Sequence, residues 1–167
     1  MLSKILNKET CAECRFCCCF RRTSLWETPI FTKENIDAIR NGNGNSDVLK
    51  EIETPSGLYA TYDLSDKYLT DDPDEEAPCP YLDPNRGCIL STEEKPWDCK
   101  IWPLRVVRQT DGEVTVALTP TCPAINKLDI EKVRFFVNKE LRASLLDYAN
   151  AHPYLIKDIK EGWHIEM

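Results

Sequence analysis

Five of the nine cysteines in this chain lie within nine residues, in the run Cys11-Ala12-Glu13-Cys14-Arg15-Phe16-Cys17-Cys18-Cys19. Cysteines that only fill space in a core behave as small apolar residues and need no such clustering. Thiols repeated at every third position can instead turn back toward one point and reach the same metal ion or cluster. The run therefore predicts a protein that binds metal through thiolates.

The length of the chain, 167 residues, predicts a single domain over residues 1–167 with one hydrophobic core. No apolar stretch is long enough to cross a membrane, and residues 1–9 contain no apolar run of the kind that forms a secretory signal. We therefore expect a cytoplasmic protein whose thiols stay reduced. The odd number of cysteines also argues against a complete set of disulfides within one chain.

The charge balance is acidic, because 21 Lys and Arg residues face 28 Asp and Glu residues, for a net charge of −7. A surface of this sign repels a phosphate backbone, so we expect no nucleic-acid partner. The acidic run Asp71-Asp72-Pro73-Asp74-Glu75-Glu76 lacks a glycine-centred calcium loop and is interpreted as a solvated loop.

Patterns in the first half of the chain predict two helices and a strand. Thr32 can cap a helix whose Ile36 and Ile39 share one face. After the break at residues 41–45, Ser46 can cap a second short helix with Val48, Leu49 and Ile52 on one side. Residues 58–62 are expected to form a strand.

Patterns in the second half predict a β-hairpin and the longest helix. Residues 104–109 and 113–118 flank a Thr-Asp-Gly turn, which is typical of a hairpin. Asp129 can cap a helix over 129–151 with apolar residues at helical spacing, ending near His152. A short helix is expected to follow around residues 154–159. The chain is thus predicted to be α+β, a small single domain with cysteine-rich loops, a β-hairpin and a long C-terminal helix.

The other cysteines are Cys79, Cys88, Cys99 and Cys122, and three of them lie in proline-rich segments: Pro78-Cys79-Pro80, Pro96-Trp97-Asp98-Cys99 and Cys122-Pro123. Proline fixes the backbone, and loops carried by a scaffold commonly present ligands. Together with the N-terminal run, these cysteines are interpreted as metal ligands. The N-terminal and central cysteine segments are therefore expected to meet in space.

Several short motifs follow one another in a distinctive order: Cys11 to Cys18, Phe31-Thr32-Lys33-Glu34-Asn35-Ile36, Cys79-Pro80-Tyr81-Leu82, Gly87-Cys88-Ile89-Leu90, Lys95-Pro96-Trp97-Asp98-Cys99, Trp102-Pro103 and Cys122-Pro123. This order resembles the CxxCxxCC, or YkgJ-like, cysteine cluster family of zinc- or iron-chelating proteins. The resemblance implies a metal site but no particular reaction. The ligands that it implies are Cys11, Cys14, Cys17, Cys18, Cys79, Cys88, Cys99 and Cys122. Cys19 is additional, so the adjacent pair of the family pattern is either Cys17–Cys18, which we adopt, or Cys18–Cys19.

Eight thiols exceed the needs of one tetrahedral site, and adjacent cysteines cannot easily reach the same ion. Two neighbouring sites, or one cluster with spare cysteines, are therefore expected. Zinc favours a closed shell of four cysteines. The contiguous Cys-x2-Cys-x2-Cys run and the distant Cys-Pro pairs are typical of ferredoxin-like iron–sulfur binding. Soft thiolates suit both metals. We favour an iron–sulfur cluster slightly over zinc and keep both open.

The function that these patterns predict is metal binding, in the service of electron transfer, metal handling or redox sensing. One alternative is an iron–sulfur-dependent enzyme, such as a protein methylase-like activity, and another is a zinc-stabilised interaction scaffold. His152 and His164 both lie beyond the last cysteine and outside any zinc-hydrolase spacing. No catalytic residue is assigned.

Overall fold

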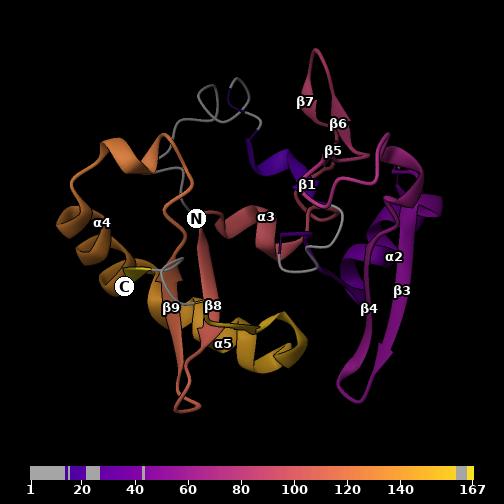
Figure 1. The fold of residues 1–167 in the computed structure, drawn as a ribbon. Coiled ribbons are helices and arrows are strands. Elements are labelled where there is room, and N and C mark those ends of the chain that lie inside the picture. The colour runs from indigo at the N-terminus through magenta and orange to yellow at the C-terminus, as the bar shows by residue number, and fades with distance from the viewer. Residues whose placement is uncertain (1–13, 15, 22–26, 43, 161–164) are drawn as a thin grey trace. The chain divides into compact units, whose positions relative to one another are not determined.

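The computed structural model describes residues 14, 16–21, 27–42, 44–160 and 165–167 (Figure 1). Helices and largely antiparallel sheets are both present, which confirms the predicted α+β class. The chain divides into two compact units, the cysteine unit, which ends at Lys100, and the C-terminal unit, which begins at Ile101. The single domain over 1–167 stays a prediction, and each unit is described by itself.

The cysteine unit contains a three-stranded antiparallel sheet in the order β2-β4-β3 and two separate strand pairs, β1-β5 and β6-β7. Its strands are β1 Cys19–Arg21, β2 Phe31–Thr32, β3 Leu49–Thr54, β4 Gly57–Tyr62, β5 Glu76–Pro78, β6 Leu82–Asp83 and β7 Gly87–Cys88. Its helical elements are η2 Phe16–Cys18, α2 Lys33–Asn41, η3 Ser46–Val48, η4 Ser65–Lys67 and α3 Trp97–Ile101, whose last residue falls in the other unit.

Helix α2 begins and ends where the sequence predicts. Thr32 is its N-cap, and the Asn35 side chain accepts a hydrogen bond from the Thr32 amide at 3.2 Å. Ile36 and Ile39 are both buried, as their shared face requires, and contribute to the core of the cysteine unit. The helix stops at Asn41, before the glycine-rich break.

The second predicted helix is wrong beyond a single turn. Only Ser46–Val48 is helical, and Leu49 and Ile52 belong to β3. β3 pairs with β4 along its whole length, from Leu49 opposite Tyr62 to Thr54 opposite Gly57. A two-residue turn joins the strands, and the positive φ of Gly57, 126°, suits it. Pairing with β4 therefore outweighs a helical spacing that is only one turn long.

The C-terminal unit contains a four-stranded sheet in the order β10-β8-β9-β11. Its strands are β8 Leu104–Arg108, β9 Val114–Leu118, β10 Lys157–Asp158 and β11 Ile165–Glu166, and its single helical turns are η5 Ile125–Lys127 and η7 Pro153–Leu155. The predicted hairpin is confirmed as β8 and β9, with Gly112 at a φ of 91° in the turn. The short helix expected around 154–159 is wrong beyond the single turn Pro153–Leu155, because β10 then pairs in parallel with β8.

The long C-terminal helix is confirmed as a continuous helical run of three parts: α4 Ile130–Phe136, the π-helical segment η6 Val137–Leu141 and α5 Arg142–Ala151. Asp129 caps it as predicted, accepting a hydrogen bond from the Glu131 amide at 3.0 Å. The buried Leu145 and Ala149 place the α5 face toward β8 and β9 (Figure 1). None of the described helices is long and apolar enough to cross a membrane.

Candidate metal centre

The predicted ligands are distributed unequally between the two units. Cys11 lies outside the described residues. Cys122 belongs to the C-terminal unit and is buried there as a free thiol. The other six lie in the cysteine unit: Cys14, Cys17, Cys88 and Cys99 are exposed, and Cys18 and Cys79 are half-buried.

The β1-β5 ladder joins the N-terminal run to the central segment. Its register sets Cys19 opposite Pro78 and Phe20 opposite Ala77. One residue further along, the amide of Cys79 donates a hydrogen bond to the carbonyl of Cys18 at 2.7 Å. Cys18 and Cys79 are therefore neighbours across this ladder, and the expected meeting of the two segments is confirmed.

The same ladder distinguishes Cys18 from Cys19. Side chains alternate between the two faces of a strand pair, so extending the register by one residue beyond the strands would set Cys18, the last residue of η2, and Cys79 on the face of Phe20 and Ala77. That face is the core side, because Phe20 and Ala77 are buried and Cys79 packs against the core. Cys19 lies on the other face. This arrangement favours Cys18, not Cys19, as the partner of Cys79.

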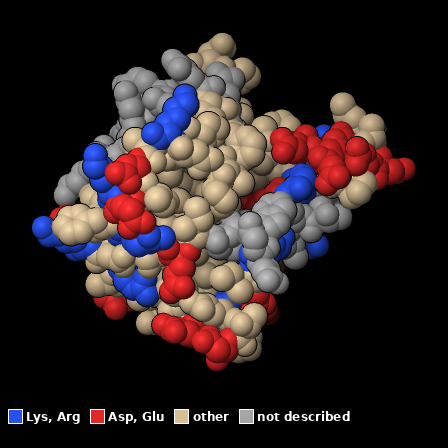
Figure 2. Space-filling view, turned by 60° about the vertical axis from the view of Figure 1, so that its left-hand side comes forward, with Lys and Arg blue, Asp and Glu red and all other residues tan. Residues whose placement is uncertain are grey.

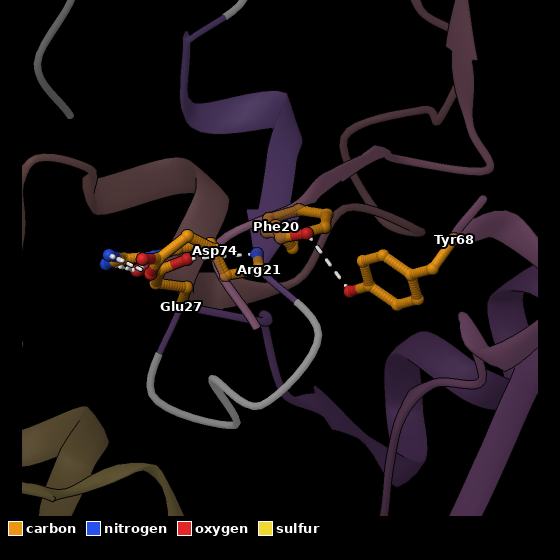
Figure 3. Close-up of polar contacts among 5 residues, drawn as sticks. All are labelled: Phe20, Arg21, Glu27, Tyr68 and Asp74. Carbon is orange, nitrogen blue, oxygen red and sulfur yellow. Dashed lines mark hydrogen bonds and ion pairs between the residues drawn. The ribbon is translucent and has the colours of Figure 1, made fainter. Parts of the chain in front are cut away.

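Polar contacts hold β1 in place (Figure 3). The Arg21 guanidinium forms an ion pair with Glu27 and lies 3.8 Å from the Asp74 carboxylate. The Glu27 carboxylate also accepts a hydrogen bond from the Arg21 amide at 3.1 Å. The hydroxyl of Tyr68 donates to the carbonyl of Phe20 at 3.0 Å. These contacts fix the strand that directly follows Cys18.

Cys88 is brought near Cys79 by a tight hairpin. The amide of Leu82 donates to the carbonyl of Cys79 at 3.0 Å, and Leu82 pairs with Cys88 across β6-β7. Gly87, at a φ of 76°, closes the turn, and the Asp83 carboxylate accepts two amides within it at 2.8 Å each. Cys88 thus pairs with a residue only three positions beyond Cys79.

Cys99 stands on α3, at the end of a loop that is tied to α2 and to the segment before β2. The side-chain amide of Asn35 donates to the carbonyl of Glu93 at 2.8 Å. The buried carboxylate of Asp98 accepts the amide of Ile30 at 3.0 Å. Neither contact is local in sequence, so the position of Cys99 depends on the fold of the whole unit.

Electrostatics join four of these thiols into one group. Burial raises the pKa of Cys79 to about 11, and the nearby Cys18 and Cys88 thiolates add to the effect. Cys99 retains exposed surface, but desolvation by the surrounding protein raises its pKa well above the usual value. Asp98, Cys79, Cys18 and Cys88 raise this pKa further. Each thiol of this set, Cys18, Cys79, Cys88 and Cys99, lies close enough to another to oppose its ionisation. We call the set the four-thiol cluster.

The four-thiol cluster has the donor chemistry of a metal site. Thiolates that are disfavoured by burial and by one another become favourable once a cation lies among them. Soft sulfur donors suit zinc and iron–sulfur clusters alike. Among the described residues, no three Cys, His, Asp or Glu groups converge closely enough to hold an ion as they stand. A metal ion bound by these thiols would therefore require their side chains to turn toward one another.

Sequence reasoning missed an aromatic group beneath the cluster. Tyr62 lies 5.2 Å from Phe31 and 5.8 Å from Tyr81 between ring centroids, and both tyrosines are buried. The thiol of Cys79 donates a hydrogen bond to the Tyr62 hydroxyl at 3.2 Å. Tyr81 could have been flagged by its place two residues after Cys79. The sequence around Tyr62 predicted only that this residue lies in a strand.

The surface and the comparisons add little to this picture. On the face that Figure 2 shows, the described Lys and Arg side chains are dispersed among acidic ones. No family model, no curated protein and no solved structure matches the chain. The resemblance to the CxxCxxCC family accordingly rests on the motifs quoted above.

Proposed function

We propose that this protein binds a metal ion or cluster through cysteine thiolates, with Cys18, Cys79, Cys88 and Cys99 as the centre of the site. The proposal rests on the Cys79–Cys18 backbone hydrogen bond, which joins two cysteine segments, and on the raised pKa values of Cys79 and Cys99, to which burial and the neighbouring thiols contribute. Four thiols gathered from separate segments match the number of ligands that a zinc ion or an iron–sulfur cluster takes.

Further ligands come from the same N-terminal run. Cys11, Cys14 and Cys17 form a contiguous run at the ferredoxin-like Cys-x2-Cys-x2-Cys spacing, and Cys18 follows Cys17 directly. Cys122 is kept as a proposed ligand on the family resemblance. Eight ligands would serve two neighbouring sites. Cys19 is left out, because its place in the ladder turns it to the opposite face from Cys79.

An iron–sulfur cluster remains slightly favoured over zinc, because of the contiguous run of cysteines. With it we propose membership of the CxxCxxCC family and a cytoplasmic role in electron transfer, metal handling or redox sensing. Reduced thiols, which such a site needs, are maintained in that compartment.

Metal and sulfide analysis of protein purified without oxygen tests this proposal. We expect iron with acid-labile sulfide and visible absorption, whereas zinc without colour would assign a zinc site and favour a scaffold role. Replacing Cys79 by Ser should remove the metal, and the matched control Cys19→Ser should keep it. A protein that holds no metal, and takes up neither zinc nor iron with sulfide, would contradict the proposal.

A further inference from the structure

The hydroxyl of Tyr62 is hydrogen-bonded to the thiol of Cys79, a member of the four-thiol cluster. Tyr62 stands at the end of β4, where the strand pairs with β3, and its ring packs between Phe20 and Phe31 at centroid distances of 5.7 and 5.2 Å. Packed rings on both sides hold the phenol in one orientation. The packing of the core therefore fixes the position of the Tyr62 hydroxyl beside the Cys79 sulfur.

A tyrosine hydroxyl can both donate and accept a hydrogen bond. As a protonated thiol, Cys79 is the donor to the Tyr62 hydroxyl, at 3.2 Å. A metal-bound cysteine is a thiolate, which has no proton and only accepts. The same pair can then keep its contact with the roles reversed, so that the Tyr62 hydroxyl donates to the sulfur. No movement of the buried ring is needed.

We propose that Tyr62 is a positioning residue of the metal centre, which donates a hydrogen bond to the Cys79 thiolate and thereby tunes the bound metal. This inference rests on the proposed function. Hydrogen bonds from outside the ligand shell orient metal ligands and tune the metal, and those to sulfur shift the reduction potentials of iron–sulfur clusters. A donated hydrogen bond stabilises the sulfur electrons, so it raises the energy of thiolate-to-metal charge transfer and makes a cluster easier to reduce.

The chain offers a matched control in Tyr81. This tyrosine is also buried, lies 5.8 Å from Tyr62 between ring centroids, and belongs to the same core. Its hydroxyl donates to the carbonyl of Asn45 at 2.7 Å and not to a cysteine. Removing either hydroxyl leaves a phenylalanine of almost the same volume. Only the loss of the Tyr62 hydroxyl should change the properties of the bound metal.

The test compares the native protein with Tyr62→Phe and Tyr81→Phe, each carrying the metal that the native protein holds, with Co²⁺ substituted if that metal is zinc. In Tyr62→Phe the charge-transfer band should move to longer wavelength and metal affinity should fall about tenfold. An iron–sulfur cluster should also become harder to reduce. Tyr81→Phe should match the native band. An unshifted band in Tyr62→Phe, or an equal shift in Tyr81→Phe, would overturn the role of Tyr62.

Two further results separate the possible failures. If the native protein itself binds neither iron–sulfur nor Co²⁺, the proposed function fails and this inference fails with it. If Tyr62→Phe loses its far-UV circular dichroism, incorporation of 3-fluorotyrosine into the Tyr81→Phe protein replaces it as the probe. Fluorination strengthens the hydroxyl as a donor, so the band should then move to shorter wavelength, and an unchanged band would overturn the inference.

Discussion

Cys18 and Cys79 lie opposite each other at the end of the β1-β5 ladder, with the Cys79 amide donating to the Cys18 carbonyl at 2.7 Å. The adjacent pair in the register is Cys19 and Pro78. In an antiparallel ladder, pairs that exchange hydrogen bonds alternate with pairs that do not. Pro78 has no N–H and occupies a position of the second kind, so it stiffens the approach to Cys79 at no cost in hydrogen bonds.

The two faces of this ladder predict different outcomes at adjacent cysteines. Cys18→Ser should lose most of the bound metal, because it removes a thiolate beside Cys79, whereas Cys19→Ser should retain it. Metal content per chain, measured by mass spectrometry on anaerobically purified variants, checks the prediction. If Cys19→Ser strips the metal and Cys18→Ser does not, the assignment of faces is wrong.

The metal-free protein should lose stability at alkaline pH. The pKa of Cys79 rises from its ordinary 9.0 to about 11 on folding, so the folded state favours the protonated thiol. This contribution is complete below pH 9 and is lost as the pH rises through about 11. The loss is on the order of 2 kcal/mol in the free energy of unfolding.

Urea denaturation of metal-free protein under reducing conditions, below pH 9 and near pH 11, measures this loss. Other groups titrate in the same range, so Cys79→Ala serves as the reference. The variant should show a smaller alkaline loss than the native chain. An identical loss in both proteins would rule out Cys79 as the source.

Asn35 is expected to stabilise the loop that leads to Cys99. Its side-chain amide donates to the carbonyls of Glu93 and Lys95 at 2.8 and 3.2 Å, and it is buried. Asn35→Ala should lower the free energy of unfolding by about 1–3 kcal/mol, because the carbonyls lose a buried partner. The control, Asn41→Ala, removes an exposed bond to Asp37 of the same helix and should cost about 0.5 kcal/mol or less. Equal costs in urea denaturation would argue against the anchoring role.

Removing the metal should loosen the cysteine unit and leave the long C-terminal helix intact. Metal binding contributes folding free energy where ligands come from short, irregular segments. The run from Ile130 to Ala151 has its own cap at Asp129 and a buried face against β8 and β9. Hydrogen exchange after chelation should speed up in β1 and β5 and stay unchanged in α4 and α5. Faster exchange throughout both helices would contradict the prediction.

Local signals explain what could be predicted of the fold. A capping residue before an apolar face defines α2 at Thr32 and the long helix at Asp129, and a Thr-Asp-Gly turn defines the β8-β9 hairpin. The errors at Leu49–Thr54 and Lys157–Asp158 both fall in strands, and the spacing of their own apolar residues does not reveal that they pair with β4 and β8. Pairing with a neighbouring strand determines the extended conformation of both segments.

The candidate site likewise combines residues that the sequence predicts with relationships that only the structure shows. Cysteine spacing, nearby prolines and the family resemblance predicted eight ligands, and the structure brings four of them, Cys18, Cys79, Cys88 and Cys99, into electrostatic reach of one another. The choice between Cys18 and Cys19 required the strand register. Tyr62 could not be found from sequence, because its contact with Cys79 depends on how β4 packs beneath the cysteine segment.

X-ray absorption at the edge of the bound metal tests the central claim most directly, because it reports the ligand atoms of the metal without a crystal. For anaerobically purified protein we predict a shell of sulfur atoms at about 2.3 Å, four per metal ion. The shell should stay complete in Cys19→Ser, whereas Cys79→Ser should hold too little metal to give it. A shell made only of nitrogen or oxygen, at about 2.0–2.2 Å, would contradict a thiolate centre.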